Sequence, residues 1–296
     1  MPYVGETAAL FTSCSWALNS VCFTLAGRRV GSASVNLLRL LMAWVILAAA
    51  HLVVYGSLFP VHAGAARLGW LSLSGLIGFA LGDAVLFEAF LLIGARLAML
   101  LMTLSPVFSV LLAWIWLKQS LSLPRLLAMA VTLAGIAWVV WGEGDREVHP
   151  HRWRGVWLGI GGALGQAVGL LFSLYGLAGG YSPFSANLVR VSAGLVALIL
   201  VFGLRGRLTG NLAAGLRDRP ASGLILLGAA TGPVLGVILS LVAIAKAPMG
   251  VAATLMSLSP VLLLPVAHFG FKEKVGVHAI LGTALALAGA AALFIV

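Results

Sequence analysis

Charge is scarce in this sequence. Only 9% of its 296 residues are charged, whereas 61% are hydrophobic. Soluble domains carry about 25% charged residues, so the composition excludes an ordinary soluble protein and indicates an integral membrane protein. Because a spanning helix needs about 20 apolar residues, some ten spans would use most of the chain and leave no room for a soluble domain.

Motifs for nucleotide binding and catalysis are also missing. The chain has no G-x-x-x-x-G-K-[ST] loop, which excludes ATP-driven transport within this chain. It has no H-E-x-x-H, no G-x-S-x-G and no paired-aspartate cation motif, which argues against an intramembrane enzyme. The two cysteines, Cys14 and Cys22, lie too far apart on one predicted helix to bridge each other. We therefore expect no catalytic residues, metal, cofactor or disulfide framework.

The net charge of +10 does not point to nucleic acid. The Lys and Arg residues are scattered singly or in pairs at the ends of apolar runs, where anionic lipid headgroups are their natural partners. The lipid bilayer is thus the expected partner, and no nucleic acid is expected. Lys and Arg gather after the odd-numbered apolar runs, so the positive-inside rule places both termini outside the cell.

Apolar runs bounded by charge, proline or glycine predict an all-α protein. Ten transmembrane helices are expected at about 4–26, 33–55, 67–92, 95–117, 124–141, 153–178, 183–204, 221–245, 249–271 and 275–296. The runs are continuously apolar rather than alternating, which excludes a membrane barrel. They form a first five-helix repeat at 1–141, a linker loop at 142–152 and a second five-helix repeat at 153–296.

The two halves are copies of each other. A shift of 154 residues places Leu104–Val107 on Leu258–Val261, and both read Leu-Ser-Pro-Val. A shift of 151 places Ser34–Arg39 on Ser185–Arg190, and both read Ser-x-Asn-Leu-x-Arg. Since five spans is an odd number, the second copy enters the membrane from the other side and the repeats are inverted. Inverted repeats predict a central cavity that either half can expose, which is the geometry of alternating access.

The sequence resembles the EamA-type repeats of the drug/metabolite transporter superfamily, which include the YddG-type amino-acid exporters. The likeness covers nearly the whole chain and rests on the early arginine of each second span, the Gly-rich third span with the stretch Gly94–Pro106, and Ala288-Gly289. The chain departs from the family pattern after the fourth span. There it has Lys118-Gln119 in place of Gly-Glu, and only the second copy keeps an acid, Glu273.

The resemblance implies a multi-pass secondary transporter of a bacterial-type inner membrane. It would act as a monomer and export small metabolites, with amino acids as the first expectation and drugs or other metabolites as the alternative. Proton coupling and facilitated diffusion both stay open. The family orientation places both termini in the cytoplasm, which is opposite to the orientation that the charge count gives.

Two matched prolines interrupt the predicted fourth and ninth spans. Pro106 and Pro260 each free a backbone carbonyl four residues earlier, at Met102 and Met256. The pair predicts hinges for rocking of helix halves about a central site, and a static kink is the alternative. The freed carbonyls are candidate acceptors for a substrate ammonium group.

Only two acidic residues, Asp83 and Glu88, fall within the predicted hydrocarbon region. Glu88 and Arg39 are expected about 6 to 9 Å from the same membrane face, which predicts a structural ion pair because an unpaired charge there costs a few kcal/mol. Asp83 lies deeper, and its equivalent in the second repeat is Val237. It is a candidate for proton exchange or for holding a substrate ammonium, unless it merely pairs with Arg39 or caps a helix.

Aromatic and small polar side chains on the predicted spans complete the candidate cavity. Small-molecule sites combine a mostly apolar lining with a few polar groups. The predicted substrate-cavity residues are Trp16, Asn19, Phe79, Asp83, Met99, Met102, Thr103, Gln166, Met256 and Ser257.

Overall fold

A computed structural model describes residues 3–116, 118, 122–142, 151–246, 255–272, 276–293 and 295 of the chain. Within these ranges the protein is helical and contains no strand. Most of the predicted linker loop at 142–152 lies outside the described residues, as do Gln119 and Glu273. The prediction of an all-α membrane protein is confirmed.

Among the described residues of the first half are six α-helices and two short helical segments of other types. They are α1 (Val4–Val30), α2 (Ser32–Tyr55), η1 (Val61–Ala63), α3 (Ala65–Gly75), η2 (Leu76–Gly82), α4 (Asp83–Leu101), α5 (Leu104–Trp116) and α6 (Leu123–Gly142). In the second half the described helices are α7 (Arg152–Leu177), α8 (Pro183–Leu204), α9 (Leu208–Arg217), α10 (Arg219–Ala229), η3 (Ala230–Gly236), α11 (Val237–Lys246), α13 (Ser259–Pro265), η4 (Val266–Gly270) and α14 (Val277–Ala292).

The described helices supply ten apolar segments. Seven are long and apolar enough to cross a membrane, and three are shorter apolar helices, Leu104–Trp116, Ser259–Gly270 and Val277–Ala292. One long segment, Ala65–Leu101, is broken at Gly94, where φ is 76° and ψ is 162°. Glycine adopts such a positive φ without the steric cost of a Cβ, so the third span can end and the fourth begin there without a loop. This agrees with the predicted boundary between residues 92 and 95.

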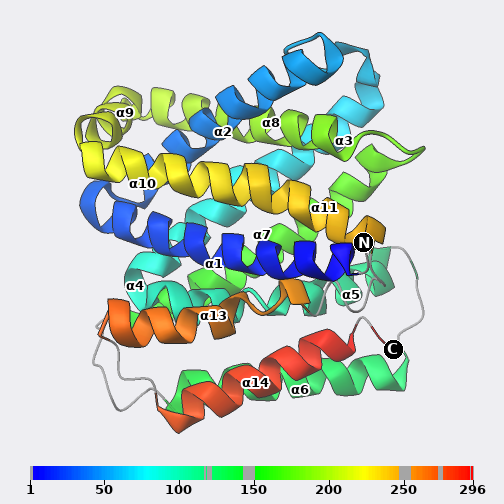
Figure 1. The fold of residues 1–296 in the computed structure, drawn as a ribbon, viewed down its shortest axis with the longest axis vertical. Coiled ribbons are helices and arrows are strands. Elements are labelled where there is room, and N and C mark those ends of the chain that lie inside the picture. The colour runs from blue at the N-terminus through cyan, green and yellow to red at the C-terminus, as the bar shows by residue number, and fades with distance from the viewer. Residues whose placement is uncertain are drawn as a thin grey trace.

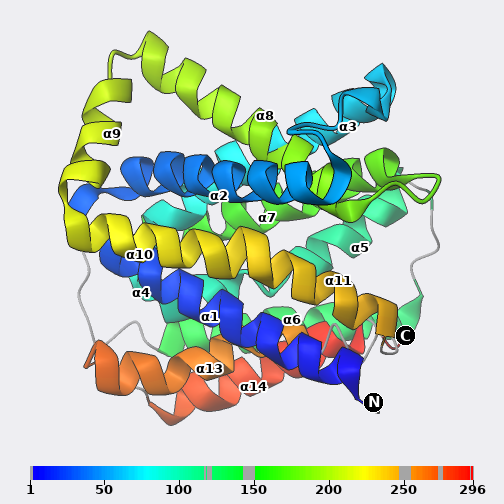
Figure 2. The same ribbon diagram turned by 45° about the horizontal axis from the view of Figure 1, so that its top comes forward.

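The two halves are inverted copies in space. Both chain ends lie at the same end of the bundle in both views (Figures 1 and 2), as expected when the chain crosses an even number of times. The first helix of each half packs on the other half. Helix α1 contacts α10, η3 and α11, while α7 contacts α3, η2 and α4, and α2 packs on α8 between them. The repeats therefore interlock rather than sit side by side.

Glycines bring the interlocked helices into backbone contact. A methyl group on Gly165 of α7 would lie 2.8 Å from the Cα of Gly82 in η2, so Gly165 has no room for a side chain. Glycines also pair α6 with α14, the fifth helices of the two repeats, which lie side by side at the lower edge of Figure 1. A methyl group on Gly282 would lie 3.0 Å from the carbonyl oxygen of Gly135.

The third span of each repeat contains a π-helical turn at the same place. Residues Leu76–Gly82 form η2 and residues Ala230–Gly236 form η3, a separation equal to the 154-residue repeat. A π-helical turn loosens the backbone hydrogen-bond ladder and is frequent at functional sites. A large hydrophobic cluster formed by leucines of α2 and α8 surrounds Phe79 of η2 and fixes its position.

Candidate substrate site

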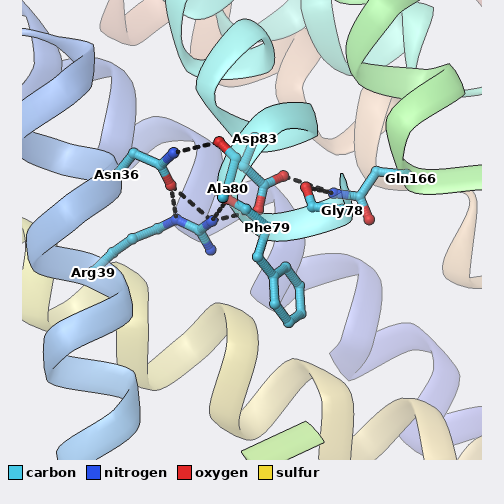
Figure 3. A network of polar contacts seen from close by, with 7 residues as sticks. All are labelled: Asn36, Arg39, Gly78, Phe79, Ala80, Asp83 and Gln166. Atoms are coloured by element: carbon cyan, nitrogen blue, oxygen red, sulfur yellow. Dashed lines mark hydrogen bonds and ion pairs between the residues drawn. The ribbon is translucent and has the colours of Figure 1, made fainter. Parts of the chain in front are cut away.

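Side chains from neighbouring helices reach the loosened carbonyl groups of η2. The Asn36 amide donates a hydrogen bond to the Ala80 carbonyl over 3.3 Å, and Arg39 Nη2 donates to the Phe79 carbonyl over 3.2 Å. From α7, Gln166 Nε2 donates to the Gly78 carbonyl over 3.4 Å. Three successive carbonyls of one π-helical turn thus gather polar side chains from both repeats (Figure 3).

A buried ion pair stands beside these carbonyls. Arg39 Nη2 pairs with Asp83 Oδ2, and Arg39 also donates from Nε and Nη2 to Asn36 Oδ1 over 3.1 and 2.9 Å. The other carboxylate oxygen, Asp83 Oδ1, accepts from Gln166 Nε2 over 2.7 Å. Arg39 is 3% exposed and Asp83 is 6% exposed. Both oxygens of Asp83 are therefore bonded by protein groups (Figure 3).

The predicted ion pair between Arg39 and Glu88 is wrong. Glu88 instead accepts a hydrogen bond from Ser32 Oγ over 2.6 Å and lies 3.8 Å from Arg154 Nη2 of the second repeat. The expected depth of the side chains in the membrane did not identify the acid that pairs with Arg39. Asp83 and Glu88 are five residues apart, so they lie roughly 140° apart around a helix and face different neighbours. Asp83 is the acid that pairs with Arg39, as the alternative interpretation of this residue proposed, whereas Glu88 bonds Ser32 at the start of α2.

Arg190, the counterpart of Arg39, is held differently. Its guanidinium lies 4.6 Å from the centroid of the Phe79 ring, while that of Arg39 lies 5.8 Å from the same ring. It attracts Asp83 through its charge but forms no hydrogen bond with it. In the part of the chain that the structure describes, Arg190 Nε is buried without a hydrogen-bond partner, and so is Asn187 Oδ1. The corresponding atoms of Arg39 and Asn36 bond each other.

The second repeat nevertheless copies one contact of the first. Asn187 Nδ2 donates to the Pro233 carbonyl in η3 over 3.0 Å, as Asn36 does to a carbonyl of η2. Asn36, Asn187 and Arg190 were not among the residues predicted to form the site. The repeated Ser-x-Asn-Leu-x-Arg motif was the signal that could have identified all three, because it recurs in both copies.

The other predicted cavity residues occupy several different helix contacts. Phe79, Asp83 and Gln166 are brought together at η2, whereas Trp16 and Asn19 of α1 lie against η3. A methyl group on Gly236 would lie 2.9 Å from Trp16 Nε1. Met99 and Met102 pack on the hydrophobic cluster around Phe23, and Met256 packs on Ala8 and Ala9. The Thr103 hydroxyl donates a hydrogen bond to the Leu100 carbonyl over 2.7 Å. Ser257 lies in a turn before α13.

The two prolines lie just after breaks in their helices. Helix turns interrupt the spans at Met102-Thr103 and at Ser257-Leu258, so Pro106 and Pro260 stand in the first turn of α5 and α13. Proline is tolerated there because the first turn has no intrahelical hydrogen bonds to lose. The Met102 carbonyl accepts from the Ser105 amide over 3.0 Å, so the expectation that it is left free for a substrate is wrong.

Polar contacts also join the two repeats at the ends of the bundle. Arg29 Nε donates to both carboxylate oxygens of Asp218 over 3.0 Å. This hydrogen bond, together with one from the Ala221 amide, holds the pKa of Asp218 below its usual range. At the opposite end Arg67 donates to the Gly176 carbonyl over 3.0 Å and to the Ala178 carbonyl over 2.9 Å.

Known proteins resemble this chain over nearly its full length. Among 26 matching chains of known structure, one described only as a crystal structure of a protein shares 17% sequence identity, with a TM-score of 0.60, over 97% of this chain and 95% of its own. At that identity the likeness shows the fold alone. No curated protein matches the chain. The sequence profile of the EamA-like transporter family matches residues 3–141 and 153–295, once in each half. The chain therefore belongs to the EamA-like transporter family, whose members are membrane transporters of the drug/metabolite transporter superfamily.

Proposed function

We propose that this protein is a secondary transporter that exports small metabolites, first of all amino acids, across a bacterial-type inner membrane by alternating access. The observation that carries the proposal is the polar network of Arg39, Asp83 and Gln166 at the interface of two interlocked inverted repeats. Charged groups inside a membrane protein are costly and commonly mark substrate or ion pathways. In inverted-repeat transporters the substrate site lies at this interface.

The choice of amino acids rests on the resemblance to YddG-type exporters, and other metabolites or drugs of the same superfamily are the alternative. Transport would occur as the repeat at 1–141 rocks against the repeat at 153–296, with hinges at Pro106 and Pro260. The helix breaks beside these prolines support this assignment, because a broken helix can bend at lower cost than a continuous one. Asp83 is the candidate carrier of a coupling proton, and the active unit is a monomer.

A flux assay tests the proposal directly. Purified protein is reconstituted into liposomes loaded with the twenty amino acids, and their release is measured by mass spectrometry at several internal concentrations. Saturable release of one or more amino acids is expected from liposomes that contain the protein and not from empty liposomes. The variant Glu88→Gln, whose side chain lies outside the network, should behave as the parent does. Release that rises linearly with concentration for every compound would contradict the proposal.

A further inference from the structure

The two repeats use one motif for two different purposes. Arg39 donates to Asn36, Asp83 and the Phe79 carbonyl through its Nε and Nη2 atoms. Arg190 occupies the equivalent place in the second repeat, but its Nε atom is buried without a hydrogen-bond partner among the described residues. Arg190 as a residue is only partly buried, whereas Arg39 is buried. Arg190 is thus the arginine that can still bind a ligand.

Among the described residues, the charges around Phe79 do not balance. Arg39 and Arg190 both lie over this ring, and Asp83 is the acid that pairs with one of them. Together the three side chains carry one excess positive charge inside the bundle. A buried charge without a counterion is costly, so one further negative charge would stabilise the site.

Asp83 is poorly placed to bind a substrate ammonium group. Its two oxygens already accept hydrogen bonds from Arg39 and Gln166. A cation would have to displace one of these donors, whereas an anion at Arg190 displaces none. The arrangement therefore favours a negative group on the substrate over a positive one.

We propose that Arg190 binds a carboxylate group of the transported molecule and so selects carboxylate-bearing substrates. This deepens the proposed function and rests on it. The planar guanidinium fork matches a carboxylate, and one carboxylate charge neutralises the one excess positive charge. The Phe79 ring, 4.6 Å away, holds the guanidinium plane by a cation–π contact.

Gly78 places no side chain of its own beside Arg190. A methyl group at this position would lie 3.7 Å from Arg190 Nη2 and 4.0 Å from Gln166 Oε1, both ordinary contact distances. The fold can therefore accept Gly78→Ala, although the added methyl would occupy room next to the guanidinium. Gly75 is different, because a methyl there would collide with the backbone of Arg190 itself.

The test compares three chemical forms of the same compounds. Proteoliposomes are loaded with amino acids, with their N-acetyl derivatives, which keep the carboxylate, or with their amides, which keep the amine. Saturable release is expected for the first two sets and at least tenfold slower release for the amides. A charge-assisted hydrogen bond is worth about tenfold to a hundredfold in binding, so Arg190→Gln should slow the acids to the rate of the amides.

The variants separate binding from folding. Arg190→Gln should lower the melting temperature less than Arg39→Gln does, since Arg190 Nε gives up no hydrogen bond to the described residues, whereas Arg39 gives up several. Should this variant fail to fold, Arg190→Lys is expected to keep the preference for acids at reduced rate, and Gly78→Ala to slow the acids. Saturable release of amides as fast as acids would overturn the carboxylate site and leave the transporter standing. Non-saturable release of all three sets would overturn both.

Discussion

Replacing Arg39 with Gln should destabilise the protein strongly. The change leaves Asp83 buried at 6% exposure with Gln166 as its remaining side-chain donor, and it removes the hydrogen bonds to Asn36 and to the Phe79 carbonyl. Removing one partner of a buried, hydrogen-bonded ion pair costs about 3–5 kcal/mol. Asp83 Oδ2 loses its donor, and Arg190 attracts the carboxylate without a hydrogen bond to it. For a chain of this size about 2 °C of melting temperature corresponds to 1 kcal/mol, which gives a loss of about 6–10 °C.

The double variant Arg39→Gln/Asp83→Asn makes this prediction specific. It removes both charges and keeps side chains that can hydrogen-bond, so its loss should be smaller than the sum of the two single losses by about 4 °C, or roughly 2 kcal/mol of coupling. Glu88→Gln is the matched control. Its partner Arg154 is 63% exposed and 3.8 Å away, and exposed pairs contribute about 0–1 kcal/mol.

Thermal unfolding in detergent, followed by size-exclusion chromatography of heated samples, measures the parent, the two single variants, the double variant and Glu88→Gln under one condition. The reasoning fails if the Arg39→Gln and Asp83→Asn losses simply add. It also fails if Arg39→Gln lowers the melting temperature no more than Glu88→Gln does.

Three further predictions concern transport and the bundle ends. Pro106→Ala and Pro260→Ala should each lower maximal flux more than substrate affinity, since the restored backbone N–H lets the helix continue across the neighbouring break and raises the barrier between states; unchanged flux in both would exclude hinges. Asp83→Asn should abolish the effect of a pH gradient on net export while substrate exchange survives, and equal loss of both modes would contradict proton coupling. The pKa of Asp218 is lower in the folded protein than in the unfolded chain, so its contact with Arg29 stabilises the fold above a pH of about 4. This stabilisation is lost as the pH falls through the folded-state pKa and the carboxylate takes up a proton. The melting-temperature difference between the parent and Asp218→Asn should therefore shrink from pH 5 to pH 3, and a constant difference would refute the contact.

Hydropathy and self-similarity were sufficient to predict the apolar spans and the repeat, but they missed α9 (Leu208–Arg217), which lies in a stretch expected to be a connection between spans. Both signals are properties of the sequence along one dimension, and they located even the break at Gly94. They also placed Gly82 on Gly236, and the structure shows that these residues close matching π-helical turns. The matched turns themselves were not predicted, because no residue pattern distinguishes a π-helical turn from an α-helical one here.

The partner of Arg39 required information that depth in the membrane does not contain. A helical wheel assumes regular α-helix, but η2 changes the angular phase of the third span immediately before Asp83. The face on which Asp83 and Glu88 lie therefore depends on the local turn. A sequence plotted on an ideal α-helix therefore does not decide which of the two acids pairs with Arg39.

The different roles of Arg39 and Arg190 had a visible cause in the sequence. The two arginines share a motif, but Asp83 has Val237 as its counterpart. One acid cannot serve two equivalent arginines in the same way, so an asymmetric site follows from that single difference. Its geometry still depended on Phe79, which lies beneath both guanidinium groups.

Access to the site from both membrane faces is the central claim, and cysteine labelling tests it most directly. In a variant without the native cysteines (Cys14→Ser/Cys22→Ser), a single cysteine replaces Gly78, which lies beside Arg190. The variant is placed in vesicles that hold a pH gradient, and a membrane-impermeant maleimide is added either inside or outside the vesicles. Alternating access predicts labelling from each side in turn, whereas a control cysteine at the exposed Arg217 reacts from one side alone. Labelling of the Gly78→Cys variant from a single side, in protein that still transports, would contradict the account.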